Sequence, residues 1–147
     1  MSTPDIEIPD DAGEWADDLR DLLSRFTSGY VGRIYCGRGW YPLICKTNRQ
    51  LRFIAPDYSV FQIKEKFGTL RFYAEMPPPS PEVTEEEHDI RRGIFEAIIE
   101  RAENMSDHVC EICGKYGRLM VPRQGSWIRT LCSSCAVEQD YIESTLD

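Results

Sequence analysis

Residues 110–114 read Cys-Glu-Ile-Cys-Gly and residues 132–135 read Cys-Ser-Ser-Cys, and these two cysteine pairs organise the rest of the chain. The pairs are separated by 18 residues. Cysteines at positions i and i+3 share one tight turn, so two such turns can present four thiolates to a single ion. We therefore predict a structural Zn²⁺ site with the ligands Cys110, Cys113, Cys132 and Cys135. Two disulfides, or four unrelated thiols, are the alternative interpretation.

The residues around and between the cysteine pairs predict a small β-hairpin and a helix. Gly114 suits the first turn, where a positive φ is often needed. Residues 119–121 and 127–131 have the composition of short strands, and residues 122–126 that of the turn between them. A helix that a serine can cap follows Cys132. This order is typical of a treble clef, with a zinc ribbon as the alternative, and four thiolates leave no open position for catalysis.

The composition indicates one compact protein or one body with a small zinc appendage. The chain has 147 residues, of which 41% are hydrophobic, and this is enough for a hydrophobic core. No apolar run reaches membrane length, and the acidic first residues lack a signal-peptide pattern. Six cysteines without such a signal favour metal binding in a reducing cytoplasm. Cys36 and Cys45 lie outside the motif, and we expect them to be buried free thiols.

The net charge of −8 is distributed in blocks. Residues 1–26 carry 8 acidic and 2 basic side chains, whereas residues 27–74 carry 2 acidic and 8 basic ones. Residues 75–107 are acidic again, and residues 108–135 are basic. An acidic chain disfavours general nucleic-acid binding, because contacts to phosphate dominate that affinity. The basic blocks keep a local nucleic-acid surface as an alternative.

We expect an α+β fold, in which residues 1–107 form one region and residues 108–147 form the zinc-binding module with its C-terminal helix. The first region is predicted to contain an acidic helix (11–26), a glycine-rich loop or irregular strand (27–39), a short helix (40–48), a β-hairpin (58–74), a proline-rich connector (76–83) and an amphipathic helix (84–106). The short helix is expected to bury Trp40, Leu43 and Ile44. In the first helix, Asp11 and Glu14 have the spacing of a capping box. Its apolar face is Trp15, Leu19, Leu22, Leu23 and Phe26, and its acidic side chains form either a solvated face or a docking face.

The hairpin is predicted from alternating apolar and polar residues on both sides of a turn at 64–69. Its apolar face is expected to consist of Phe61, Ile63, Leu70 and Phe72. Its other face is expected to show Gln62, Lys64, Arg71 and Tyr73. Basic and aromatic residues mixed on a sheet can bind single strands, although they more often form an ordinary exposed face.

The helix over 84–106 is predicted to start with a capping box between Thr84 and Glu87. Its apolar stripe is expected to be Ile90, Ile94, Ala97, Ile98 and Met105. Its acidic side chains lie within about 60° of arc on the opposite side, and these are Glu85, Asp89, Glu96, Glu100 and Glu103.

Several stretches resemble a known group of proteins. Residues 62–73 read Gln-Ile-Lys-Glu-Lys-Phe-Gly-Thr-Leu-Arg-Phe-Tyr, and they precede Ala-Glu-Asn-Met-Ser at 102–106 and the two cysteine pairs. This arrangement resembles a family of small, mostly uncharacterised phage and prophage zinc-ribbon proteins, and the match spans about 40–135. The resemblance implies a viral or mobile-element origin and a bacterial cytoplasmic setting. It supplies no catalytic residues.

No catalytic constellation is evident in the sequence, since there is no phosphate-binding loop, nucleophile elbow or His-Glu-x-x-His motif. His108 could replace a cysteine ligand or simply be exposed. We therefore expect a non-enzymatic protein that binds a host protein or complex, for example an anti-CRISPR-like inhibitor of bacterial defence, through the five acidic residues of the helix over 84–106. The alternative is a nucleic-acid-binding zinc module whose surface joins Lys64, Lys66, Arg71, Lys115, Arg118, Arg123 and Arg129.

Overall fold

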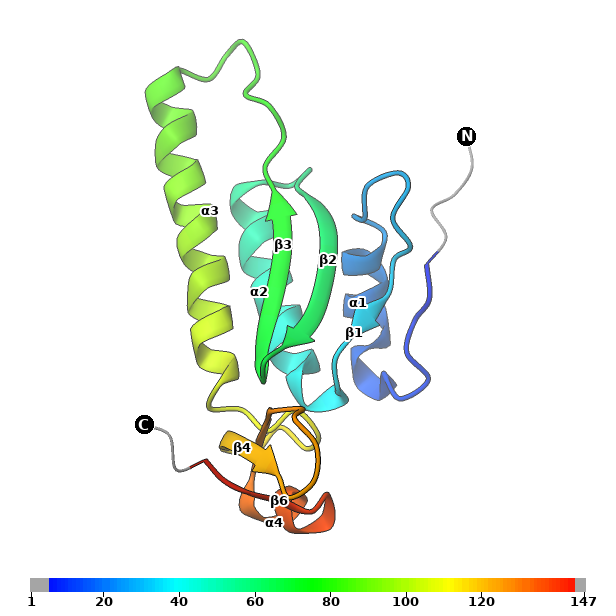
Figure 1. Cartoon of the computed structure of the whole chain (residues 1–147). Helices are drawn as coiled ribbons and strands as arrows, with labels where there is room; N and C mark the ends of the chain where they lie inside the picture. Colours follow the sequence, from blue (N-terminus) through cyan, green and yellow to red (C-terminus); the bar gives the residue numbers. More distant parts are fainter. Residues whose placement is uncertain (1–5, 145–147) are drawn as a thin grey trace.

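Three helices and a three-stranded sheet form the body of the protein, and a small cysteine-rich module lies at one end of it (Figure 1). The computed structural model describes residues 6–144. The body contains the 3₁₀ turns η1 (Gly13–Trp15) and η2 (Arg38–Trp40), the helices α1 (Ala16–Leu23), α2 (Tyr41–Ile54) and α3 (Glu85–Ser106), and the strands β1 (Ile34–Tyr35), β2 (Ser59–Lys66) and β3 (Thr69–Glu75). The module contains β4 (Arg118–Pro122), β5 (Arg129–Leu131), α4 (Ser133–Glu138) and β6 (Tyr141–Glu143). The predicted α+β class is confirmed.

The predicted hairpin is present as β2 and β3, and β1 adds to β2 in parallel. Its turn is shorter than predicted, because Phe67 and Gly68 both have positive φ, of 54° and 84°, and close the hairpin in two residues. The predicted apolar face is wrong at one position. A bulge between Val60 and Gln62 shifts the register, so Val60, and not Phe61, is fully buried together with Ile63.

The first helix is shorter than the predicted range of 11–26. Gly13 has a φ of 53° and begins the 3₁₀ turn η1, and neither η1 nor α1 has a side-chain cap. The carboxylate of Asp11 accepts a hydrogen bond from the hydroxyl of Tyr41 at 2.8 Å, so the predicted capping role of Asp11 is wrong. The predicted apolar face is confirmed, since four of its members are buried: Leu19, Leu22, Leu23 and Phe26.

The acidic face of α1 contacts basic side chains of the same body. Asp18 pairs with Arg49 at 2.5 Å, and Asp21 accepts hydrogen bonds from Asn48 at 2.8 Å and Arg52 at 3.2 Å. Burial by itself raises the pKa of Asp21, but the bond from Asn48 and the nearby cations outweigh it and hold this pKa below its ordinary value. The acidic block of residues 1–26 and the basic block of residues 27–74 therefore pair with each other between α1 and α2.

The second helix is longer than predicted, since α2 continues to Ile54 instead of ending near residue 48. Trp40 and Ile44 are fully buried, as predicted, whereas Leu43 is only half-buried, and Leu51 extends the buried face by two further turns. Cys45 is a buried free thiol, as expected, whereas Cys36 is a free thiol that is only partly buried. Residues 76–84 form no helix or strand and connect β3 to α3.

The helix α3 begins as predicted but buries a different face. Thr84 accepts a hydrogen bond from the backbone N–H of Glu87, and the predicted capping box is complete. The predicted apolar stripe is wrong, because only Ile98 is half-buried and the other members are exposed: Ile90, Ile94, Ala97 and Met105. The buried residues of this helix are Phe95, Ala102 and Ser106.

The edge of the sheet explains which face of α3 is buried. β3 is an edge strand, so the backbone N–H groups of Leu70 and Phe72 need acceptors. The hydroxyl of Ser106 accepts from Leu70 at 2.8 Å, and the carboxylate of Glu103 accepts from Phe72 at 3.0 Å. Polar side chains of α3 therefore face the sheet, and Glu103 is half-buried instead of belonging to a fully exposed acidic stripe.

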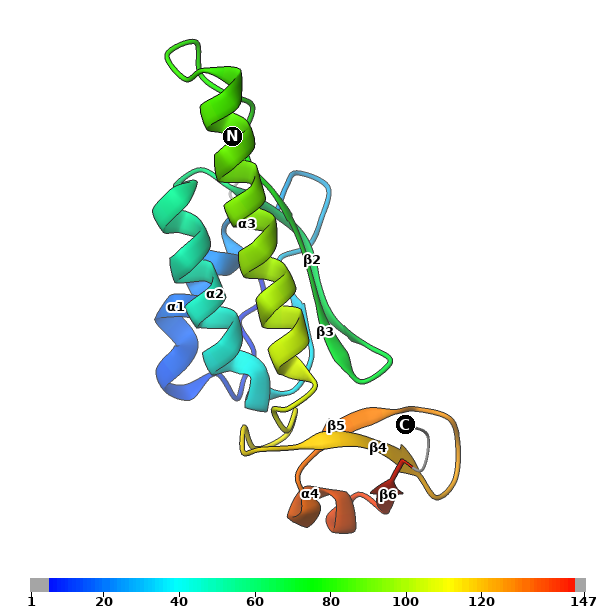
Figure 2. The same cartoon turned by 90° about the vertical axis from the view of Figure 1, so that its left-hand side faces the viewer.

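The helices α2 and α3 lie side by side, and the N-terminal half of α3 extends beyond the end of α2 (Figure 2). Residues 89–94 are all exposed. Within residues 6–144, no helix combines the length and the apolar character that crossing a bilayer requires.

Candidate metal centre

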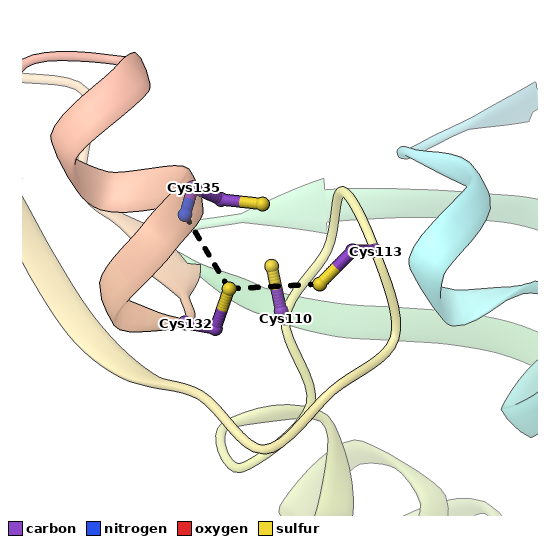
Figure 3. A group of neighbouring side chains, drawn as sticks. All are labelled: Cys110, Cys113, Cys132 and Cys135. Atoms are coloured by element: carbon purple, nitrogen blue, oxygen red, sulfur yellow. Dashed lines mark hydrogen bonds between the residues drawn. The ribbon is translucent and has the colours of Figure 1, made fainter.

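Four sulfur atoms converge in the module, as the cysteine spacing predicted. Cys110 and Cys113 come from the turn before β4, whereas Cys132 and Cys135 come from the start of α4, and all four side chains point toward one another (Figure 3). Their sulfur atoms all lie within 4.8 Å of one another. Metal–sulfur bonds of about 2.3 Å in a tetrahedron place sulfur atoms about 3.8 Å apart, so the cluster is close enough to hold one metal ion.

The first turn is closed by backbone hydrogen bonds. The N–H of Cys110 donates to the carbonyl of Lys115 at 2.7 Å, and the N–H of Gly114 donates to the carbonyl of Cys110 at 2.9 Å. Gly114 has a φ of 83°, which confirms the prediction of positive φ at this residue. Backbone hydrogen bonds alone therefore hold the turn that carries Cys110 and Cys113.

The second pair is fixed by the N-terminus of α4. Cys132 is the N-cap residue, and its sulfur accepts a hydrogen bond from the N–H of Cys135 at 3.4 Å. The predicted serine cap is therefore wrong. The same hydrogen bond lowers the pKa of Cys132 to about 7, whereas burial raises the pKa of Cys135. One thiolate thus forms easily, and further thiolates next to it need a cation to balance their charge.

The cluster has no further ligand among the described residues. His108 has an exposed side chain that stacks on Tyr116 with ring centroids 6.1 Å apart and pairs with Asp107, so it is not part of the cluster. Cys110 is fully buried, and Cys132 and Cys135 are each 8% exposed. The small core of the module consists of three of these cysteines with only Met120, Leu131 and Ala136. A core of this size is small for an independent module, and an ion bound by the four sulfur atoms would add to its stability.

The first cysteine turn rests on the glycine-rich segment of the body. The N–H of Gly39 donates to the carbonyl of Glu111 at 2.8 Å, and the indole of Trp40 donates to the carbonyl of Val109 at 2.7 Å. A Cβ atom on Gly39 would lie 2.6 Å from the carbonyl carbon of Glu111 and closer still to the carbonyl oxygen of Cys110. The glycine at this position is therefore required by the close approach of two backbones.

The carboxylate of Glu111 is the buried polar link between the two parts. It is 3% exposed, accepts a hydrogen bond from the N–H of Gly37 at 2.8 Å, and pairs with Arg129 at 3.4 Å. Burial raises the pKa of Glu111, although the Gly37 N–H and Arg129 favour its charged form. The sequence analysis did not single out Glu111, although its place between the first two cysteines is a signal that could have done so.

The Lys-Glu-Lys-Phe-Gly string forms the second contact between the body and the module. The carboxylate of Glu65 accepts from the N–H of Gly68 at 2.8 Å and from the indole of Trp127 at 3.0 Å. The buried hydroxyl of Thr130 donates to the carbonyl of Gly68 at 2.7 Å. The string therefore has a structural role, because it shapes the hairpin turn and presents it to β5.

We expect the substitution Glu111→Ala to destabilise the protein by about 3–5 kcal/mol, because it leaves Arg129, which is 12% exposed, without its buried partner. Urea unfolding followed by tryptophan fluorescence measures this change. The matched control is Glu143→Ala, which breaks the exposed pair with Arg118 and should cost less than about 1 kcal/mol. Equal effects of the two substitutions would show that Glu111 does not link the two parts.

The basic residues proposed for a nucleic-acid surface divide into three paired arginines of the module and four residues without an ion pair among residues 6–144. Arg118, Arg123 and Arg129 form ion pairs with Glu143, Asp140 and Glu111. The other four have no ion pair with any residue in the range 6–144, and three of them are on the hairpin: Lys64, Lys66, Arg71 and Lys115. The fold thus neutralises much of the positive charge of the module.

The acidic residues of α3 are divided between two places. Glu96, Glu100 and Glu103 line a groove of about 450 Å³ between α3 and β3, where Glu75 joins them. The groove also contains the apolar side chains of Phe61, Phe72 and Ile99. Glu85 and Asp89 lie on the projecting half of the helix, where Asp89 pairs with Arg92 at 2.9 Å. The structure therefore brings three of the five predicted acidic residues into one groove.

No protein-family model, no curated protein and no solved structure matches this chain. The resemblance of residues 62–73 and the cysteine pairs to phage and prophage zinc proteins therefore stays a prediction.

Proposed function

We propose that this chain is a non-enzymatic, zinc-stabilised binding protein of phage or prophage type that docks on a basic surface of a host protein or complex in the bacterial cytoplasm. The observation that carries the proposal is the acidic groove between α3 and β3. Glu75, Glu96 and Glu100 have no ion-pair partner within residues 6–144, although they line one groove with apolar side chains.

A groove of this composition suits long basic side chains. The methylene groups of lysine or arginine pack on apolar residues such as Phe61 and Ile99, while the charged end of the side chain meets the carboxylates. A surface that normally holds nucleic acid presents many such side chains in a row. An acidic protein that occupies this surface would block it, as an anti-CRISPR-like inhibitor of a defence nuclease would do.

The metal in this proposal is zinc with a purely structural role. Four thiolates in a closed cluster favour zinc over the harder cations that prefer oxygen ligands. We assign the module to the treble-clef class, because a cysteine turn, the β4–β5 hairpin and α4 follow one another and the last two ligands stand at the start of α4. The ion would neutralise the charge of the thiolates. All four of its coordination positions would be occupied by sulfur, so none would be open to a substrate.

Affinity capture from a bacterial host lysate tests the proposed function. The bait variants are the wild-type chain, the groove variant Glu96→Lys/Glu100→Lys, and the control Glu82→Lys/Glu138→Lys, which makes the same charge change at exposed positions outside the groove. Glu103 is left intact because it accepts the Phe72 N–H. We expect the wild type and the control to retain a protein partner after nuclease treatment, and the groove variant to lose it.

Two results would count against the proposal. Retention of the same partner by the groove variant would remove the acidic groove as the docking site. Loss of all bound material after nuclease treatment would favour the nucleic-acid-binding alternative, whose signature is binding that weakens steeply with salt.

A further inference from the structure

The projecting helix α3 carries an apolar stripe that the fold leaves uncovered. Ile90 is 58% exposed and Ile94 is 47% exposed, and on the neighbouring helix Phe53 is 86% exposed. The stripe continues into a groove of about 610 Å³ between α2 and α3, whose lining includes Phe53, Ile54, Ile94, Ala97, Ile98 and Arg101. Figure 2 shows the two helices next to each other along this face.

The sequence along this stripe has a symmetric arrangement about Ile94. Ile90 precedes it by four residues and Ile98 follows it by four, while Glu87 precedes it by seven and Arg101 follows it by seven. Residues at these spacings lie on one face of a helix. The stripe therefore has an acid at one end, a base at the other end, and isoleucines at equal distances between them.

We propose that this stripe joins two copies of the chain, with their α3 helices antiparallel and crossing near Ile94. In that arrangement the isoleucines of the two copies pack together, and Glu87 of each copy meets Arg101 of the other. The interface is two-fold symmetric, which is the commonest symmetry of protein oligomers. A 22-residue helix is about 33 Å long, so the contact can extend over the whole stripe, and Phe53 of each copy covers its edge.

Charge complementarity selects a second copy over another occupant. An acid and a base at equal distances from one central residue match an identical helix that runs in the opposite direction. A partner of different sequence would not require this symmetric spacing. The acidic groove lies on the β3 side of α3, whereas this stripe lies on the α2 side. Pairing of two copies therefore leaves the acidic groove open. The dimer can thus be tested independently of the proposed host partner.

Sedimentation equilibrium of the full, metal-loaded chain tests the pairing. We expect the wild type to approach twice the chain mass of 17.0 kDa at micromolar concentrations. Both Arg101→Glu and Glu87→Arg replace two attractive contacts by two repulsive ones, so each should raise the dimer dissociation constant by at least about tenfold. The control Arg92→Glu makes the same charge change off the stripe and should leave the dimer unchanged. Glu87 also accepts the Thr84 N–H in the capping box, so Glu87→Gln, which keeps an acceptor there, separates the loss of the cap from the change of charge.

Mixing the two charge variants provides the decisive measurement. Arg101→Glu and Glu87→Arg chains should form a heterodimer when combined, because every end-to-end pair between them then joins an acid to a base. This recovery also excludes misfolding as the cause of the monomeric state of each variant. Two results would overturn the proposal. One is a wild type that stays monomeric at about 100 µM, a concentration at which even a weak micromolar dimer forms. The other is a dimer that both stripe variants leave unchanged.

Discussion

Removal of the metal with a strong chelator should destabilise the whole protein and not only its C-terminal module. Structural zinc contributes roughly 10–16 kcal/mol in zinc-finger peptides, and a typical domain has a free energy of unfolding of only about 5–15 kcal/mol. Gly39, Trp40 and Gly68 of the body form hydrogen bonds with the module, so unfolding of the module breaks these bonds in the body as well. We expect the free energy of unfolding to fall by at least about 5 kcal/mol.

Thermal unfolding with and without chelator, followed by tryptophan fluorescence, measures this effect. The genetic equivalent is Cys132→Ser, and its control is Cys45→Ala, which removes a buried thiol outside the cluster. Elemental analysis of the reduced protein should find one zinc ion per chain in the wild type and in the control, and none in Cys132→Ser. An unchanged melting temperature after the metal has left would contradict the structural role of the ion.

The substitution Gly39→Ala should be among the most damaging changes in the body, although it adds only one methyl group. The new Cβ atom would lie 2.6 Å from the carbonyl carbon of Glu111 and closer still to the carbonyl oxygen of Cys110. Both are backbone atoms of the cysteine turn, which cannot rotate away as a side chain can. We expect a loss of about 3 kcal/mol or more, together with weaker metal retention, because the turn must move away from its seat.

Urea unfolding at low protein concentration measures this loss, with Gly93→Ala as the matched control. A Cβ atom on Gly93 meets nothing within 4 Å, and alanine is the better helix former, so this control should stabilise the protein by up to about 1 kcal/mol. If Gly39→Ala behaved like Gly93→Ala, the close approach of the two backbones would not exist in solution.

The two cysteine pairs were predictable from the sequence because the geometry of each pair is local. Cys110 and Cys113 are brought together by one turn, and Cys132 and Cys135 by the first turn of α4. The hairpin and the capping box at Thr84 are local as well and were predicted, although the bulge after Val60 and the two-residue turn were not. Neighbouring residues supply the defining interactions of each cysteine pair, of the hairpin and of the cap, whereas the meeting of the two cysteine pairs joins segments that are 18 residues apart.

The buried face of α3 was not predictable in the same way. Apolar spacing assigned Ile90 and Ile94 to the core, but the backbone of β3 requires acceptors and draws Ser106 and Glu103 toward the sheet. Likewise, nothing within residues 27–39 indicates that these glycines contact the cysteine turn at residues 110–114. These features depend on contacts between segments that are distant in sequence.

The contact between Trp40 and Val109 also affects how the protein matures on the ribosome. The two residues are 69 positions apart, so at usual elongation rates the indole leaves the exit tunnel roughly 3 to 14 seconds before its acceptor leaves it. During this interval the large aromatic surface of Trp40 lacks the hydrogen-bond partner beside which it is finally buried. The segment around Trp40 is therefore one place where a co-translational chaperone would shield apolar surface until the cysteine turn has emerged.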